Sequence, residues 1–172
     1  MALDPEMERL AEAFRALGAY DPEGWARSEV REGINQYARF VFLRAAWTYV
    51  IPEGCTSWID ALIQESDRRP RGPGAGAGPA LKRMLAAGAS GEDIAEVVRV
   101  MQWDVLAGLA YLLADPGVVE YPSEELPRVN WTLFEVDDEG QPLWPIDALH
   151  ESVLDTDPTG REMRPKGVGR DG

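Results

Sequence analysis

Residues 91–114 read GEDIAEVVRVMQWDVLAGLAYLLA, and this stretch decides the expected fold. Ser90 followed by Asp93 is typical of a helix N-terminus, and Asp115 with Pro116 ends the segment. Its apolar residues recur at helical spacing, and other apolar side chains point in the remaining directions. The positions expected to face inward are Ile94, Val97, Val98, Met101, Val105, Leu109 and Leu112. A helix that is apolar nearly all round is normally buried, so we expect this one to be the central helix.

A second apolar helix is expected over residues 22–50. Asp21, Pro22 and Glu23 are typical of a helix start, with an N-cap side chain, a proline and an acidic residue in the first turn. Pro52 ends the segment, whose second half is apolar almost all round. The two apolar helices would therefore form a central pair. Shorter helices are expected over residues 5–17, 57–66, 80–87 and 146–154.

The period of the pattern changes after Pro122. Residues 130–136 are rich in β-branched and aromatic side chains, and residues 141–146 can return beside them after a turn. The sequence therefore predicts an α+β fold, predominantly α, with about five or six helices around the central apolar pair and a C-terminal β-hairpin. We expect a single domain over residues 1–157, with a flexible Gly- and Pro-rich loop at 68–79 inside it, and a loose tail over 158–172.

Charge and composition narrow the range of partners. The 172 residues carry a net charge of −13, and residues 115–157 hold twelve acidic side chains against one basic side chain, Arg128. Because such a surface repels phosphates, we expect neither nucleic acid nor a membrane as a partner, whereas a basic protein suits it. The lone Cys55, the N-terminus without an apolar core, and the short apolar run at 100–114 favour a cytoplasmic location. Arginine far outnumbers lysine, which favours a bacterial, GC-rich source.

No catalytic or cofactor motif is complete. The glycine-rich stretch 72–79 lacks the lysine that directly follows the last glycine of a phosphate-binding loop. Nothing in the pattern brings Cys55 and His150 together, so a small buried cysteine and a surface histidine are favoured over a Cys–His hydrolase. Residues 155–160 match half of a calcium loop, but Lys166 replaces its bidentate glutamate, so an Asp-capped turn is favoured. We therefore expect no cofactor and no metal, and lean towards a protein that is not an enzyme.

Asp104 is the most unusual residue of the apolar segment, because a buried carboxylate needs a partner. Arg39 and Arg44, on the other apolar helix, are the obvious candidates. The structural interpretation is a buried Asp–Arg pair between the two helices. The functional interpretation is a polar pocket there, formed by Asp104, Gln102 and an arginine, which would make the protein a small-molecule-binding protein or a small enzyme.

The hairpin combines aromatic and acidic residues. Its aromatic residues include Trp131 and Trp144, and its acidic residues are Glu135, Asp137, Asp138 and Glu139. One face of the hairpin should cover the helices, and aromatic anchors rimmed by charge on the other would be typical of a binding site. The favoured function is a non-catalytic acidic binding protein that docks a basic protein partner through this region, as immunity or inhibitor proteins do.

Overall fold

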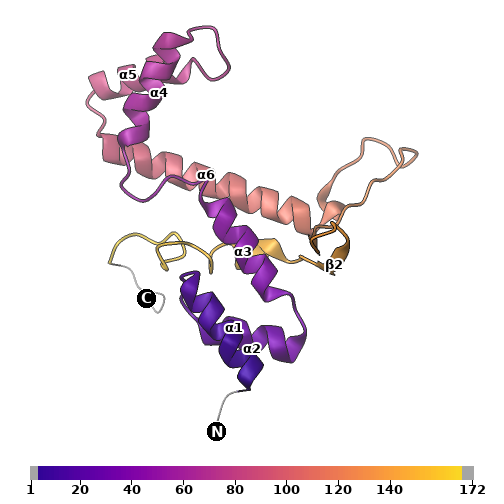
Figure 1. Cartoon of the computed structure of the whole chain (residues 1–172). Helices are drawn as coiled ribbons and strands as arrows, with labels where there is room; N and C mark the ends of the chain where they lie inside the picture. Colours follow the sequence, from indigo (N-terminus) through magenta and orange to yellow (C-terminus); the bar gives the residue numbers. More distant parts are fainter. Residues whose placement is uncertain (1–3, 168–172) are drawn as a thin grey trace. The chain divides into compact units, whose positions relative to one another are not determined.

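A computed structural model describes residues 4–167 of the chain. Within that range the fold is α+β and predominantly α, with seven α-helices and a two-stranded antiparallel hairpin near the C-terminus (Figure 1), which confirms the predicted fold class. The α-helices are α1 (Pro5–Ala16), α2 (Pro22–Glu32), α3 (Gln36–Trp47), α4 (Ser57–Arg68), α5 (Ala77–Ala86), α6 (Gly91–Ala114) and α7 (Leu149–Ser152). The strands are β1 (Phe134–Val136) and β2 (Pro142–Pro145), and a short 3-10 helix, η1 (Pro116–Val118), follows α6.

The chain divides into two compact units, and the prediction of a single domain over 1–157 stays a prediction. The first unit comprises residues 1–49 and 104–172, and the second comprises residues 50–103. Helix α6 contributes its first half to the second unit and its second half to the first.

The first two helices begin where the sequence predicts. Asp4 caps α1 by accepting the backbone N–H of Glu6 at 3.0 Å, and Asp21 caps α2 by accepting that of Gly24 at 2.9 Å. Both caps satisfy N–H groups that have no partner inside the helix, and the proline that follows each cap has no N–H to satisfy. Local sequence alone therefore determines these two helix starts.

The predicted helix over residues 22–50 is wrong, because two helices occupy that range. Gly33 ends α2 in the left-handed conformation, with φ 67°, which costs a glycine little. Asn35 then caps α3 through a 3.4 Å hydrogen bond from the N–H of Ala38. Gly33 and Asn35 are a typical stop and start, a local signal that the helical spacing of the apolar residues does not contain.

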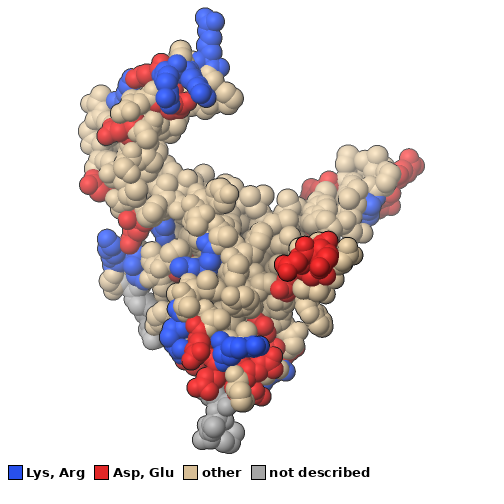
Figure 2. All heavy atoms as spheres, in the orientation of Figure 1, with Lys and Arg blue, Asp and Glu red and all other residues tan. Residues whose placement is uncertain are grey.

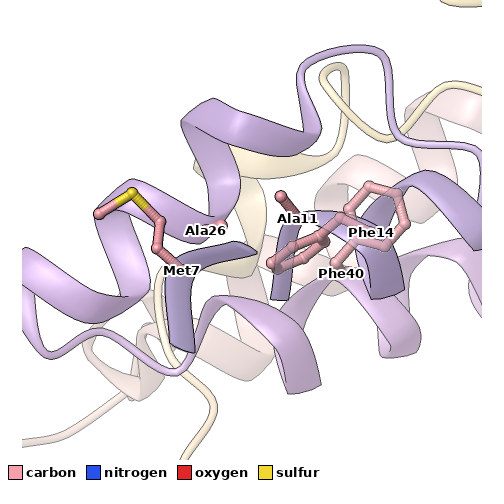
Figure 3. Close-up of a cluster of buried hydrophobic side chains, with 5 residues drawn as sticks. All are labelled: Met7, Ala11, Phe14, Ala26 and Phe40. Atoms are coloured by element: carbon pink, nitrogen blue, oxygen red, sulfur yellow. The ribbon is translucent and has the colours of Figure 1, made fainter. Parts of the chain in front are cut away.

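The core of the first unit is aromatic. Met7, Ala11 and Phe14 of α1, Ala26 of α2 and Phe40 of α3 form one buried cluster (Figure 3). Phe14 is fully buried, and its ring meets that of Phe40 edge to face at a centroid distance of 5.4 Å. This geometry is the one that aromatic pairs prefer.

Residues 146–157 pack against α3 and complete this unit (Figure 1). Ile146, Leu149 and Val153 are buried, and the buried indole of Trp47 donates its Nε1–H to the carbonyl oxygen of Val153 at 3.0 Å. The described part of the predicted loose tail, residues 158–167, continues in hydrogen-bonded turns. Asp157, 4% exposed, accepts the hydroxyl of Thr159 and backbone N–H groups beyond it, so the Asp-capped turn is confirmed.

The second unit packs α4, α5 and the start of α6 around Ile59, Leu81 and Ile94. Helix α5 begins at Ala77, three residues before its predicted start, and Gly78 lies against Ser66 of α4. A Cβ at position 78 would lie 2.4 Å from the Cβ of Ser66, so only glycine fits there. Residues 69–76 form the turns between α4 and α5, and the flexibility predicted for residues 68–79 stays a prediction.

Helix α6 has the predicted bounds, but it is not the buried central helix. Val97, Met101, Val105 and Leu109 follow one another at four-residue spacing and are between 52% and 63% exposed. An apolar helix is buried only if the rest of the chain supplies enough apolar surface to cover it, and helical periodicity cannot reveal that. With its 24 residues α6 is also long and apolar enough to cross a membrane, a property shared by core helices of soluble proteins. The cytoplasmic location and the absence of a membrane partner stay predictions.

Candidate functional site

The turn of the hairpin is built around Asp137. Its carboxylate accepts the backbone N–H groups of Glu139 at 3.0 Å and Gln141 at 2.8 Å, and Gly140 takes a positive φ of 78°. A side chain that accepts nearby backbone N–H groups in this way stabilises the turn. Asp137 therefore shapes the hairpin, whereas Asp138 and Glu139 project into solvent at its tip.

Apolar side chains of both strands are exposed. Phe134, Val136, Leu143 and Trp144 are between 44% and 65% exposed, and acidic side chains gather over the hairpin in Figure 2. The expectation that one face of the hairpin covers the helices is wrong for these residues, since only the adjoining Ile146 is buried. A two-stranded sheet is marginal by itself, so exposed apolar residues on both strands are typical of a surface that a partner covers.

The two tryptophans that the sequence singled out have different roles. Trp131 is partly buried and donates its indole N–H to the carbonyl oxygen of Leu112, 2.8 Å away, in the last turn of α6. That carbonyl is one of the four that a helix end leaves without an intrahelical partner. Trp131 is therefore a structural residue, and Trp144, 65% exposed, is the aromatic residue available to a partner.

Trp144 borders an open hollow of about 210 Å³, which Glu29, Gly33, Ile34 and Asn35 also line. Asn35 donates its side-chain N–H to Glu135 of β1 at 2.9 Å, and this bond ties the hairpin to the connection between α2 and α3. Asn35 and Glu29 were absent from the predicted site, because only the fold brings that connection to the hairpin. The α2–α3 break at Gly33 was the one sequence signal that could have indicated them.

Glu29 is held in an environment that disfavours its charge. Burial raises the pKa of this carboxyl above its usual value, and the negative charges of Glu135 and Glu6 raise it further. The N–H of Tyr37, which Glu29 accepts at 2.6 Å, acts in the opposite direction. A cation placed in the hollow would therefore relieve an unfavourable negative charge.

The four residues of the predicted pocket do not form one. Asp104 is exposed. Within the described residues, neither of the two predicted arginines pairs with it, so the expected buried Asp–Arg pair is wrong. Arg39, 5% exposed, instead bonds Asp147 at 3.1 Å and the hydroxyl of Ser152, and Arg44 donates to the carbonyl oxygen of Thr156.

The glutamine predicted for the same pocket has a structural partner in the second unit. The side-chain oxygen of Gln102 accepts the N–H of Ile51 at 2.8 Å, while buried Arg99 donates to the carbonyl oxygen of Ile51. These bonds satisfy the backbone where the chain enters the second unit. Gln102 and Arg99 of α6 thus bond both backbone groups of Ile51.

Cys55 and His150 each have a local neighbour. The sulfur of Cys55, which is partly exposed, lies 3.4 Å from the hydroxyl of Ser57, and the exposed His150 ring meets that of Tyr111 edge to face. Within residues 4–167, His, Cys, Asp and Glu side chains form no group that could hold a metal ion.

Comparison with known proteins adds no family: no family model, no curated protein and no solved structure matches the chain.

Proposed function

We propose that the protein is a non-catalytic acidic binding protein that docks a basic protein partner through its hairpin, in the manner of immunity or inhibitor proteins. The observation that carries this proposal is the exposed indole of Trp144 at the edge of a hollow that also contains the carboxylate of Glu29. Exposed tryptophans beside a concave surface are typical anchors of protein interfaces.

The charges near Trp144 select a cationic partner. Glu29 and Glu135 lie at or beside the hollow, and Asp138 and Glu139 are exposed at the tip of the same hairpin. A lysine or arginine of the partner could lie on the indole face, where a cation–π contact contributes roughly 0.5–2 kcal/mol, while its charge is neutralised by the carboxylates. The exposed acids at the tip would mainly accelerate association and make it sensitive to salt.

The alternative, a ligand pocket around Asp104, gains no support from the positions of its residues. Asp104 is exposed, and Arg39 is already bonded to Asp147 and Ser152. The hairpin site therefore remains the better candidate.

The test of the docking site separates it from general electrostatic attraction. The first measurement is affinity capture from the native host's lysate at low and at moderate salt, followed by titration of the basic protein identified. Charge reversal of Asp138 and Glu139 together should weaken binding at least about tenfold, and Trp144→Ala should cost roughly 2 kcal/mol or more of binding free energy. Asp137 is left unchanged, because it closes the turn.

The matched control is a second double variant with the same net charge as the Asp138 and Glu139 reversal. Glu124 and Glu125 are also exposed acids in the region of residues 115–157, and reversing both changes the charge by the same amount away from the hairpin. If both double variants weaken binding equally and Trp144→Ala has no effect, attraction is general and the hairpin is not the docking site.

A further inference from the structure

A second hollow in the first unit is independent of the hairpin. It has a volume of about 250 Å³, and its lining includes Asp21, Trp25 and Ser28 of the α2 region, Gln36 of α3, and Ser152 and Asp155 of the C-terminal segment. This volume approaches the lower end of the range found for small-molecule sites. Gln36 and Ser152 are nine-tenths or more buried, so the lining of the hollow includes two polar groups that the fold holds in place.

Gln36 is the unusual group of this hollow. Its side-chain N–H donates to the hydroxyl of Ser28 at 2.8 Å, and that hydroxyl donates in turn to the carboxylate of Glu32 at 3.1 Å. Because a hydroxyl has a single proton and the carboxylate can only accept, Ser28 must accept from the amide nitrogen of Gln36. This chain of bonds orients the amide and directs its oxygen away from Ser28.

The amide oxygen that results has no donor. Gln36 is 7% exposed, and its Oε1 is a buried acceptor without a hydrogen-bond partner among the described residues. Leaving such an atom unpaired is unfavourable, and native proteins rarely do so without a ligand, an ion or a water molecule in reach. A ligand with an N–H group would supply the missing donor.

The remaining groups of the hollow select a cation. Asp21 and Asp155 contribute two exposed carboxylates, and no lysine or arginine is among the described residues that line it. One oxygen of Asp21 caps α2, and Trp25 and Tyr20 add aromatic surface. Carboxylates, an amide oxygen and aromatic faces together match a planar cation with several donors better than they match a compact, strongly hydrated ammonium group.

We propose that this hollow binds the guanidinium group of a small ligand. The guanidinium would donate to the amide oxygen of Gln36 and to the carboxylates of Asp21 and Asp155, and would stack on the indole of Trp25. The site is separate from the docking surface at Trp144, so either can fail without the other.

The probe is n-butylguanidinium, with n-butylurea as its uncharged match, each titrated into the full-length protein by calorimetry at low salt. We expect butylguanidinium to bind at least about tenfold more tightly than butylurea, and increasing salt to weaken it. A blocked Gly-Arg-Gly peptide distinguishes the source of the group: weaker binding than butylguanidinium indicates a free small molecule, and equal binding shows that arginine side chains also enter. Equal binding of the urea and the guanidinium would overturn the proposal.

Two variants assign the binding to this hollow. Asp21→Asn removes one charge while keeping a good N-cap residue for α2, and should weaken butylguanidinium binding about tenfold. Glu124→Gln removes the same charge at an exposed residue that lines neither hollow, and should leave binding unchanged. Gln36→Leu removes the amide acceptor and should weaken binding further, with its folding checked by circular dichroism. Equal affinities of Asp21→Asn and Glu124→Gln would show that the cation binds elsewhere or only through the overall charge.

Discussion

Replacement of Trp47 by phenylalanine tests whether residues 146–157 are an integral part of the first unit. Trp47 is 2% exposed, and its indole N–H is shared between the carbonyl oxygen of Val153 at 3.0 Å and the hydroxyl of Thr156 at 3.1 Å. Phenylalanine keeps an aromatic ring in the same place but cannot donate either bond. The substitution therefore weakens the attachment of this segment to α3 without adding bulk.

The expected loss of stability is the sum of two effects. The lost hydrogen bond contributes about 1 kcal/mol net to stability. The carbonyl oxygen of Val153 still accepts the hydroxyl of Thr156 in the variant, so it is not left unpaired and costs no further free energy. The smaller ring removes roughly two buried carbon atoms at about 0.8 kcal/mol each. Trp47→Phe should thus lower the free energy of unfolding by about 2–3 kcal/mol.

Urea denaturation followed by far-ultraviolet circular dichroism measures this change. With a denaturant dependence of about 1–3 kcal/mol per molar for small proteins, the midpoint should fall by roughly 1 M or more. Trp144→Phe is the matched control, because Trp144 is 65% exposed and the same substitution there should change stability by less than about 0.5 kcal/mol. Equal small changes in both variants would refute the packing of residues 146–157 on α3.

Two further predictions test other parts of the structure. The folded structure raises the pKa of Glu29 above its usual value of 4.5. The ionised carboxylate therefore lowers the free energy of unfolding above pH 4.5. This loss of stability disappears at lower pH, where the carboxyl is protonated in both the folded and the unfolded state. Glu29→Gln should therefore stabilise the protein at pH 7, and the gain should vanish near pH 4; thermal melts across this pH range that show no pH-dependent difference would contradict it. Ile94→Ala should lower the free energy of unfolding by about 2–5 kcal/mol, because Ile94 is only 4% exposed. Val105→Ala should lower it by less than about 0.5 kcal/mol, because Val105 is 60% exposed. A large loss of stability for Val105→Ala in urea denaturation would mean that this face of α6 is covered.

Part of the candidate site could be predicted from residue types alone. The pairing of aromatic and acidic residues in 131–144 indicated a docking surface on the hairpin, and Trp144 and the acids at its tip are exposed. Which of the two tryptophans is partly buried could not be predicted. The indole N–H of Trp131 has the helix-end carbonyl oxygen of Leu112 within reach, and that proximity arises from the fold.

The polar residues of the helices have partners, or an exposure to solvent, that the sequence pattern did not indicate. Asp104 was expected to be buried because its neighbours are apolar, yet a helix with apolar residues on every side must leave some of them exposed when the chain covers only part of it. Arg39 was expected to meet Asp104, but it is buried against Ser152, which lies 113 residues away in the chain. Such long-range partners leave no periodic signal.

The sequence by itself determined the local elements: the capped starts of α1 and α2, the bounds of α6 and the turn that Asp137 closes. Each depends on hydrogen bonds between residues only a few positions apart, so the residue types suffice. The tertiary structure decided which apolar surfaces are covered, where α3 and residues 146–157 meet, and that Gln36 carries an unpaired oxygen beside a hollow. These features depend on which distant surfaces pack together, a property of the whole chain that neither composition nor periodicity encodes locally.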